Sequence, residues 1–187
     1  MRKVFILFIF ILFQTIVYGQ MGKGISFGFA PYGHTGVRTT SGKEDIYSSD
    51  FSISNSSFHL GYEWREGYKN EITVDAFFAK EVITDTLGVA GIDATRFSVY
   101  GFSGYTLFPA KRVQIPIYIG LGLSYYNQPI PAKLFFDMGA RARLKVYLTN
   151  TLAIYGEGYY IFGFTGTETS KYVANRYGIE TGLLLYF

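Results

Sequence analysis

The strictest pattern in the chain is a two-residue alternation that runs unbroken over residues 113–126. Every odd position there is large and apolar: Val113, Ile115, Ile117, Ile119, Leu121, Leu123 and Tyr125. The even positions are small or polar, apart from Pro116 and two tyrosines. Successive side chains of a β-strand point to opposite faces, so the pattern predicts a strand with one continuous hydrocarbon face. Pro116 argues mildly against it, because proline removes a donor from the ladder.

The same alternation recurs often enough to predict eight strands. The others lie at about 25–30, 58–64, 71–78, 96–108, 137–148, 152–162 and 176–187. Segment 96–108 is irregular, since Tyr100 and Phe102 break the parity of its other apolar residues, so we expect either a bulge or two interior aromatics there. No segment after the N-terminus approaches the continuous apolar length of a transmembrane helix. An all-β fold follows.

The connections between these strands alternate in length. Long stretches at 33–57, 81–95, 127–135 and 165–175 are separated by tight turns at 65–69, 109–112 and 149–151. Outer-membrane barrels have short periplasmic turns and longer outer loops. The alternation therefore predicts an antiparallel up-and-down transmembrane β-barrel, with the short turns and Phe187 on the periplasmic side.

The N-terminus has the pattern of a signal peptide. Arg2 and Lys3 precede an apolar run over 4–17, and Val17 and Gly19 stand at −3 and −1 of a cleavage site. A membrane anchor is the rival reading, but the run is short for a span of about 20 residues. We expect residues 1–19 to be a signal peptide for Sec export and residues 20–187 to form one barrel domain.

Charge and composition exclude several classes of function. Loss of Arg2 and Lys3 would bring the 17 basic residues to within one of the 14 acidic residues, so nothing favours nucleic acid as a partner. The chain has no cysteine and two histidines, so we expect neither a metal centre nor a cofactor.

The charged positions indicate which face of the strands is the lumen. A hairpin centred on Asn150 puts Glu157 opposite Arg143 or Arg141, and such cross-strand pairs are favourable. The predicted lumen is nearly neutral, with acidic Glu63, Glu71, Asp75, Asp137, Glu157 and Glu180 against basic Arg96, Arg141, Arg143, Lys145 and Arg176.

A soluble eight-stranded barrel would put these charges on a solvated face instead. The long aromatic faces favour the membrane barrel. So do aromatic residues near strand ends, where an interfacial girdle lies: Tyr62, Trp64, Tyr105, Tyr125 and Tyr177.

A signal peptide, eight alternating segments and the ending Gly-Leu-Leu-Leu-Tyr-Phe resemble the small OmpA/OmpX-type outer-membrane barrels. The resemblance is one of architecture and covers the whole mature chain. It implies a protein of the bacterial outer membrane, in contact with membrane lipid and lipopolysaccharide, and we expect a monomer. It also implies a C-terminal signal for the barrel-assembly machinery at Ile179, Leu183, Leu185 and Phe187, with Thr181 as a weak member.

No catalytic residues are predicted. Some barrels of this size are lipid A deacylases with a His-x-Ser pair, but His34-Thr35-Gly36 and His59-Leu60-Gly61 do not fit that pattern. We expect His59 to be an interior residue near Glu63, and His34 to be solvated at the start of an outer loop. Gly120 and Gly122 are expected to make room for tyrosines rather than to hold phosphate, because no helix follows them.

Three functions remain, and the first is preferred. It is a non-enzymatic outer-membrane barrel with a structural or surface-interaction role, whose loop 33–57 either meets an extracellular ligand or only solvates the mouth of the barrel. The second is a narrow channel for small solutes or ions, in which the basic row Arg141, Arg143 and Lys145 would favour anions. A lipid-modifying enzyme is third. Against the channel, the expected lumen is crowded by Tyr118, Tyr126, Tyr147, Tyr155 and Tyr159.

Overall fold

The structure is a computed structural model that describes residues 22–39, 47–48, 56–66, 69–85, 92–108, 112–127, 134–166 and 171–187. The signal peptide expected at 1–19 lies outside the described residues. Within them, no helix has the length and apolar character needed to cross a bilayer.

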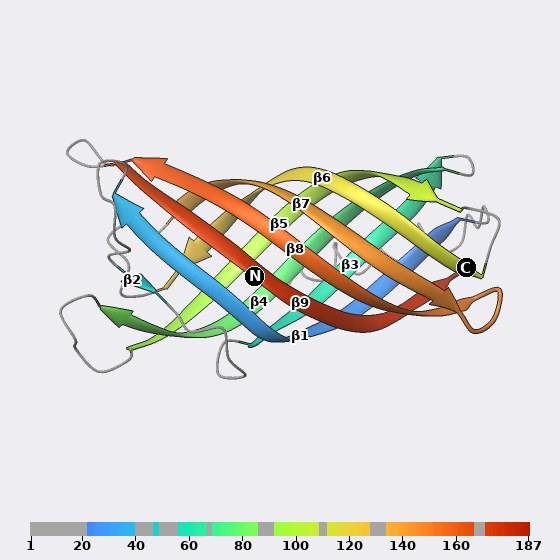
Figure 1. The fold of residues 1–187 in the computed structure, drawn as a ribbon, viewed down its shortest axis with the longest axis horizontal. Coiled ribbons are helices and arrows are strands. Elements are labelled where there is room, and N and C mark those ends of the chain that lie inside the picture. The colour runs from blue at the N-terminus through green and yellow to red at the C-terminus, as the bar shows by residue number, and fades with distance from the viewer. Residues whose placement is uncertain are drawn as a thin grey trace, which may run out of the picture.

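Eight long strands close into one barrel (Figure 1). Each pairs antiparallel with its neighbours along the chain, and β1 also pairs with β9, which closes the sheet. A two-residue strand, β2 (Tyr47–Ser48), pairs with β1 and β4 at one rim. The predicted eight-stranded up-and-down barrel is confirmed. The long strands are β1 (Lys23–Thr39), β3 (Ser56–Glu66), β4 (Asn70–Asp85), β5 (Ile92–Leu107), β6 (Val113–Tyr126), β7 (Leu134–Tyr147), β8 (Leu152–Gly166) and β9 (Lys171–Tyr186).

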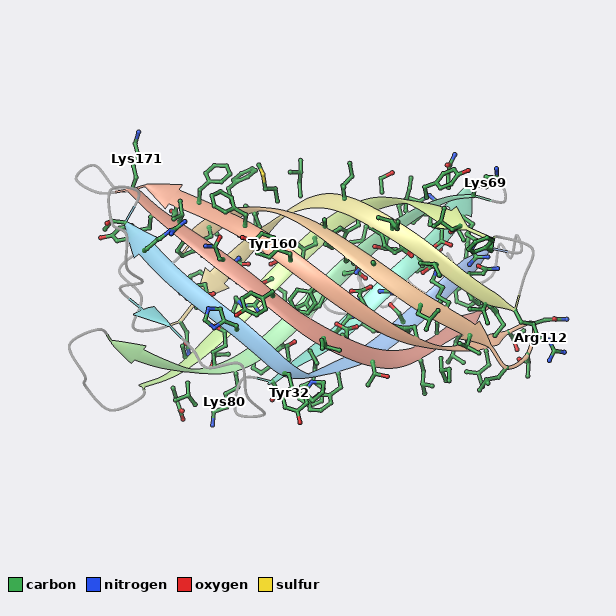
Figure 2. The ribbon with its side chains drawn as sticks, in the orientation of Figure 1. Tyr32, Lys69, Lys80, Arg112, Tyr160 and Lys171 are labelled. Atoms are coloured by element: carbon green, nitrogen blue, oxygen red, sulfur yellow. The ribbon has the colours of Figure 1, made fainter. Side chains whose placement is uncertain are left out.

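The two rims of the barrel differ in their connections. One rim, here named the turn end, carries the connections 67–69, 108–112 and 148–151 and the C-terminus. The other rim, the loop end, carries 40–55, 86–91, 127–133 and 167–170. Figure 2 shows Lys69 and Arg112 at the turn end and Lys171 at the loop end.

The alternation in β6 separates inside from outside. Its odd positions face outward, with Ile119 70% exposed, and its even positions, such as Tyr118 and Ser124, are buried in the barrel. Polar and aromatic side chains therefore fill the interior, and hydrocarbon covers the exterior. Pro116 is accommodated because the β6–β7 pairing passes from Gln114 directly to Ile117. No ladder donor is needed from proline in that gap.

The irregular segment becomes β5, and it has no bulge. Its register with β4 and β6 is continuous, and Tyr100 and Phe102 both point inward. Their rings lie over the glycines of β6. A Cβ atom on Gly122 would come within 2.2 Å of the Tyr100 ring, and one on Gly120 within 2.3 Å of Phe102. The glycines make room for one tyrosine and one phenylalanine, not for two tyrosines.

The predicted outer loops are too long. A register shift between Phe29 and Tyr32 lets β1 continue to Thr39 along β9, so residues 33–39 of the expected loop 33–57 are strand. Thr35 and Val37 are buried inside, and the ring of His34 stacks on Tyr177 at 4.7 Å instead of being solvated at a loop start.

Loops 81–95 and 165–175 are shortened in the same way by β4, β5, β8 and β9. The connection 167–170 is no longer than the turn 148–151, so strict alternation of length is wrong at this hairpin. Ladder hydrogen bonds join backbone groups, and they continue where the outward side chains become polar. Strand ends that are predicted from the first polar side chains therefore make the strands too short.

Candidate functional site

The structure places all eleven predicted lumen charges inside the barrel, where each is buried. They come from every long strand except β1 and β6. Along the barrel they gather, with the lumen tyrosines, into a turn-end cluster, a middle cluster and a loop-end cluster. Of the expected lumen tyrosines, Tyr118, Tyr126 and Tyr155 are fully buried, whereas Tyr147 and Tyr159 are half-buried.

The turn-end cluster is built around Lys145. Its ammonium donates to Glu63 Oε1 at 2.6 Å and to Glu71 Oε2 at 2.7 Å, across the lumen from β7 to β3 and β4. Tyr118 donates to the same Glu71 oxygen at 2.5 Å. Nη2 of the half-buried Arg65 lies 3.1 Å from Glu71 Oε1, and Arg65 is the member of the cluster at the turn end. One ammonium thus joins two carboxylates on different strands.

The middle cluster contains two arginines from β7. Arg143 Nε donates to Glu157 Oε2 at 2.6 Å, and Arg141 Nη1 reaches Glu157 Oε1 at 3.4 Å. The register sets Arg143 directly opposite Glu157, and Glu157 therefore meets both arginines that the sequence left as alternatives. Arg141 also pairs with Asp75 at 2.7 Å. The Arg143 guanidinium lies 4.2 Å from the ring centroid of Tyr155.

His59 lies in the same cluster between two carboxylates. Its Nε2 is 2.7 Å from Asp75 Oδ1, and its Nδ1 is 2.6 Å from Glu180 Oε1. The ring stacks on Phe77 at 4.7 Å. Since an ionised carboxylate only accepts hydrogen bonds, both ring nitrogens must donate, which makes His59 a structural cation. Its partners are Asp75 and Glu180, rather than the expected Glu63.

The loop-end cluster joins β9, β7, β6, β5 and β4. Arg176 donates from Nη1 to Asp137 Oδ1 at 2.8 Å and from Nε to the Tyr126 hydroxyl at 2.8 Å. Tyr100 donates to Asp137 Oδ2 at 2.9 Å. The cluster also contains a second ion pair, in which Arg96 Nε donates to Glu81 Oε1 at 2.9 Å.

Sequence reasoning missed two members of these clusters. The polarity pattern places Glu81 in a loop and Arg65 in a turn, yet Glu81 is buried beside Arg96 and Arg65 binds Glu71. Both could have been found from parity alone. Glu81 continues the inward odd positions of β4, and Arg65 continues those of β3.

Together the clusters fill the lumen and balance its charge. Seven buried carboxylates face five buried cations, the half-buried Arg65 and His59. Buried charges persist only where they are paired and hydrogen-bonded, and these are. Lys145 and Glu63 have 0% exposure, because protein atoms surround both side chains. Within the described residues, no group of three or more acidic or histidine side chains is placed to hold a metal ion.

The three aliphatic residues of the predicted C-terminal signal face the exterior of the barrel. Ile179, Leu183 and Leu185 are exposed on the outer face of β9. The backbone N–H of Phe187 donates to the Lys23 carbonyl at 3.0 Å, beside the seam where β9 meets β1. Tyr105, Tyr125 and Tyr177 of the expected girdle are likewise exposed on the wall, whereas Tyr62 and Trp64 are half-buried.

Comparisons with known proteins bear on this fold. No protein-family model matches the sequence, and no curated protein matches it. Among solved structures, Neisserial surface protein A (NspA) is similar with a TM-score of 0.64 at 14% identity, over 89% of this chain and 97% of that one. The outer membrane protein OprG from Pseudomonas aeruginosa is similar with a TM-score of 0.57 at 10% identity, over 89% and 96%. The chain therefore has the closed eight-stranded fold of the small outer-membrane β-barrels, which the resemblance to OmpA/OmpX-type proteins predicts.

Proposed function

We propose that this protein is a non-enzymatic β-barrel of the bacterial outer membrane whose lumen is closed. It would act as a rigid scaffold that meets its surroundings through the connections at the loop end. The observation that carries this proposal is the ion-pair network, which fills the barrel from Arg65 at one rim to Glu81 near the other. The exposed hydrocarbon wall supports a membrane location.

The same network weakens the case for a channel. The basic row that would attract anions is already bonded to carboxylates: Arg141 to Asp75, Arg143 to Glu157 and Lys145 to both Glu63 and Glu71. A passing anion would have to displace these partners at an uncompensated electrostatic cost. Side chains alone fill the lumen of a barrel of this size.

A binding role for the loop end is supported by the contrast between the rigid barrel wall and the connections at its rim. Binding residues are most often carried on loops positioned by a rigid scaffold. The connection 40–55 is the longest at this rim and includes β2, which ties it to β1 and β4. This connection replaces the broader 33–57 as the proposed site for an extracellular ligand.

Single-channel recording in planar bilayers tests the closed lumen. The purified, refolded protein is expected to give no steady openings, in a preparation whose heat-modifiable migration on gels shows that the barrel is folded. Steady openings of defined size from folded protein would replace the scaffold with a channel.

Mass spectrometry of lipid A tests the non-enzymatic part of the proposal. His59 is buried between Asp75 and Glu180, where no lipid headgroup reaches it. Lipid A from a deletion strain is expected to match that of the parent strain. A change in acyl-chain number that is restored by the wild-type gene would overturn this view.

A further inference from the structure

The outer wall of the barrel is hollowed at mid-height on one side. Two adjoining depressions, of about 760 Å³ and about 530 Å³, share Ala140 and Tyr160 in their linings. We name them together the wall groove. It crosses β5, β6, β7, β8 and β9, and Figure 2 shows Tyr160 midway along the barrel.

The groove exists because small residues face outward between large ones. A Cβ atom on Gly101 or Gly158 would meet nothing within 4 Å, so the space outside both is open. Ala140 also lies in the floor, and Ile119 and Tyr160 rise beside it with more than half of each side chain exposed. In a bilayer, such a hollow must be filled, because an empty one forfeits dispersion contacts along its lining.

A strip of outward side chains leads along β9 from the groove to the loop end. They are Tyr177, Asn175, Val173 and Lys171, polar except for Val173, and Tyr160 of the groove donates to Asn175 Oδ1 at 3.2 Å. On β1, Arg38 pairs in register with Val173, which places it beside Lys171. Neither Arg38 nor Lys171 has an ion-pair partner among the described residues.

The distances along this strip suit one lipid molecule. Six residues separate Tyr177 from Lys171, roughly 20 Å along the strand. With a strand tilt of about 40° the difference in depth is roughly 15 Å, which is half of a hydrocarbon core about 30 Å thick. A lipid whose headgroup lies at Lys171 would therefore bring its acyl chain down to the groove within one leaflet.

We propose that the wall groove binds an acyl chain of a phospholipid with a net negative headgroup, which is held by Arg38 and Lys171. The inference rests on the membrane location proposed above. Charge complementarity favours this ligand, because two adjacent cations stand above an apolar groove. A second copy of the chain docked on this face about a two-fold axis would bring the same two cations together, which opposes dimerisation.

Native mass spectrometry of the full-length protein, released from detergent micelles, tests the proposal with dimyristoyl phosphatidylglycerol and dimyristoyl phosphatidylcholine. The two lipids share their chains and differ in net charge. The wild type is expected to retain one phosphatidylglycerol in preference to phosphatidylcholine. Each of Arg38→Gln and Lys171→Gln should reduce that preference about fivefold, given the attraction of one basic residue to an anionic lipid surface. Lys80→Gln, at the same rim on the opposite wall, is the control.

Substitutions that fill the groove test whether the groove binds the acyl chain. Gly158→Leu should abolish retention of both lipids, because the new side chain occupies open space without disturbing the fold. Gly101→Leu is a second variant of the same kind, and Ala76→Leu on the outer face of β4 is the control. A heat-modifiability gel of each variant separates loss of binding from loss of folding.

Three outcomes would overturn the proposal. These are equal retention of the two lipids by the wild type, undiminished retention in Gly158→Leu and Gly101→Leu, and a wild-type dimer that either substitution converts to monomer. The last would assign the groove to a second copy. Failure of the membrane proposal itself would appear separately, as a protein that does not insert into bilayers.

Discussion

At the scale of single residues, the lumen charges depend on one another. Glu157 lies within hydrogen-bond reach of both Arg141 and Arg143, and Lys145 holds Glu63 and Glu71. Removing one member leaves a partner charged and buried, which destabilises far more than the intact pair stabilises.

A double-mutant cycle on Arg143 and Glu157 tests this dependence. Arg143→Met is expected to lower the free energy of unfolding by about 3–5 kcal/mol, because Glu157 loses its closest partner. The double variant Arg143→Met/Glu157→Met should recover more than half of that loss. Urea titration in lipid vesicles measures both.

The control for the cycle is Arg112→Met, at an exposed residue of the turn end. It should change the unfolding free energy by less than about 0.5 kcal/mol. If Arg143→Met behaves like Arg112→Met, then water reaches the lumen and the closed interior is wrong.

At the scale of elements, β5 and β6 show how large inward side chains on one strand require small residues on the adjacent strand. Tyr100 and Phe102 enter the lumen from β5, and glycine stands opposite each of them on β6. Without those glycines the backbone itself would be crowded, since a Cβ on Gly122 would lie 2.3 Å from the Val99 carbonyl oxygen. Two inward aromatics next to one another are possible only on such a surface.

Gly122→Ala tests this division. The substitution is expected to destabilise the barrel by about 1–3 kcal/mol through overpacking against Tyr100 and the β5 backbone. Gly101→Ala, on the neighbouring strand, is the matched control, because its new methyl group points into open space. A shift in the midpoint of urea unfolding should appear in the first variant alone, and equal midpoints would show that β5 and β6 adjust freely.

At the scale of the whole molecule, the barrel presents its polar face to its own axis and its hydrocarbon face to the surroundings. Closure gives each long strand two paired neighbours, so most ladder groups are paired within the barrel wall. A bilayer would then surround the mid-height of the wall, with the two rims at its surfaces.

The depth of a lysine on the outer face tests this placement. Ile119→Lys, at mid-height, should destabilise the folded state in vesicles by about 2–4 kcal/mol, whereas Val113→Lys, near the turn end, should cost about 0–1 kcal/mol. Both residues are exposed on the same strand, which makes them a matched pair. Equal effects would contradict a bilayer centred on the middle of β6.

Much of this architecture was readable from the chain. Period-two alternation determines which side chains share a face, and it identified eight strands, eleven of the inward charges and the antiparallel order without any structure. It also placed Glu157 near Arg143, because a short hairpin determines its own register.

The tertiary structure decided the rest, since each remaining feature depends on strands that are distant in the sequence. The pairing of His59 with both Asp75 and Glu180 requires barrel closure, which brings β9 across the lumen from β4. The extension of β1 through residues 33–39 depends on ladder bonds to β9 after a bulge. The wall groove arises because sheet closure and register bring the outward glycines of β5 and β8 to the same height as the alanines of β7. Local pattern determines the face of each residue, but closure of the sheet determines its partners.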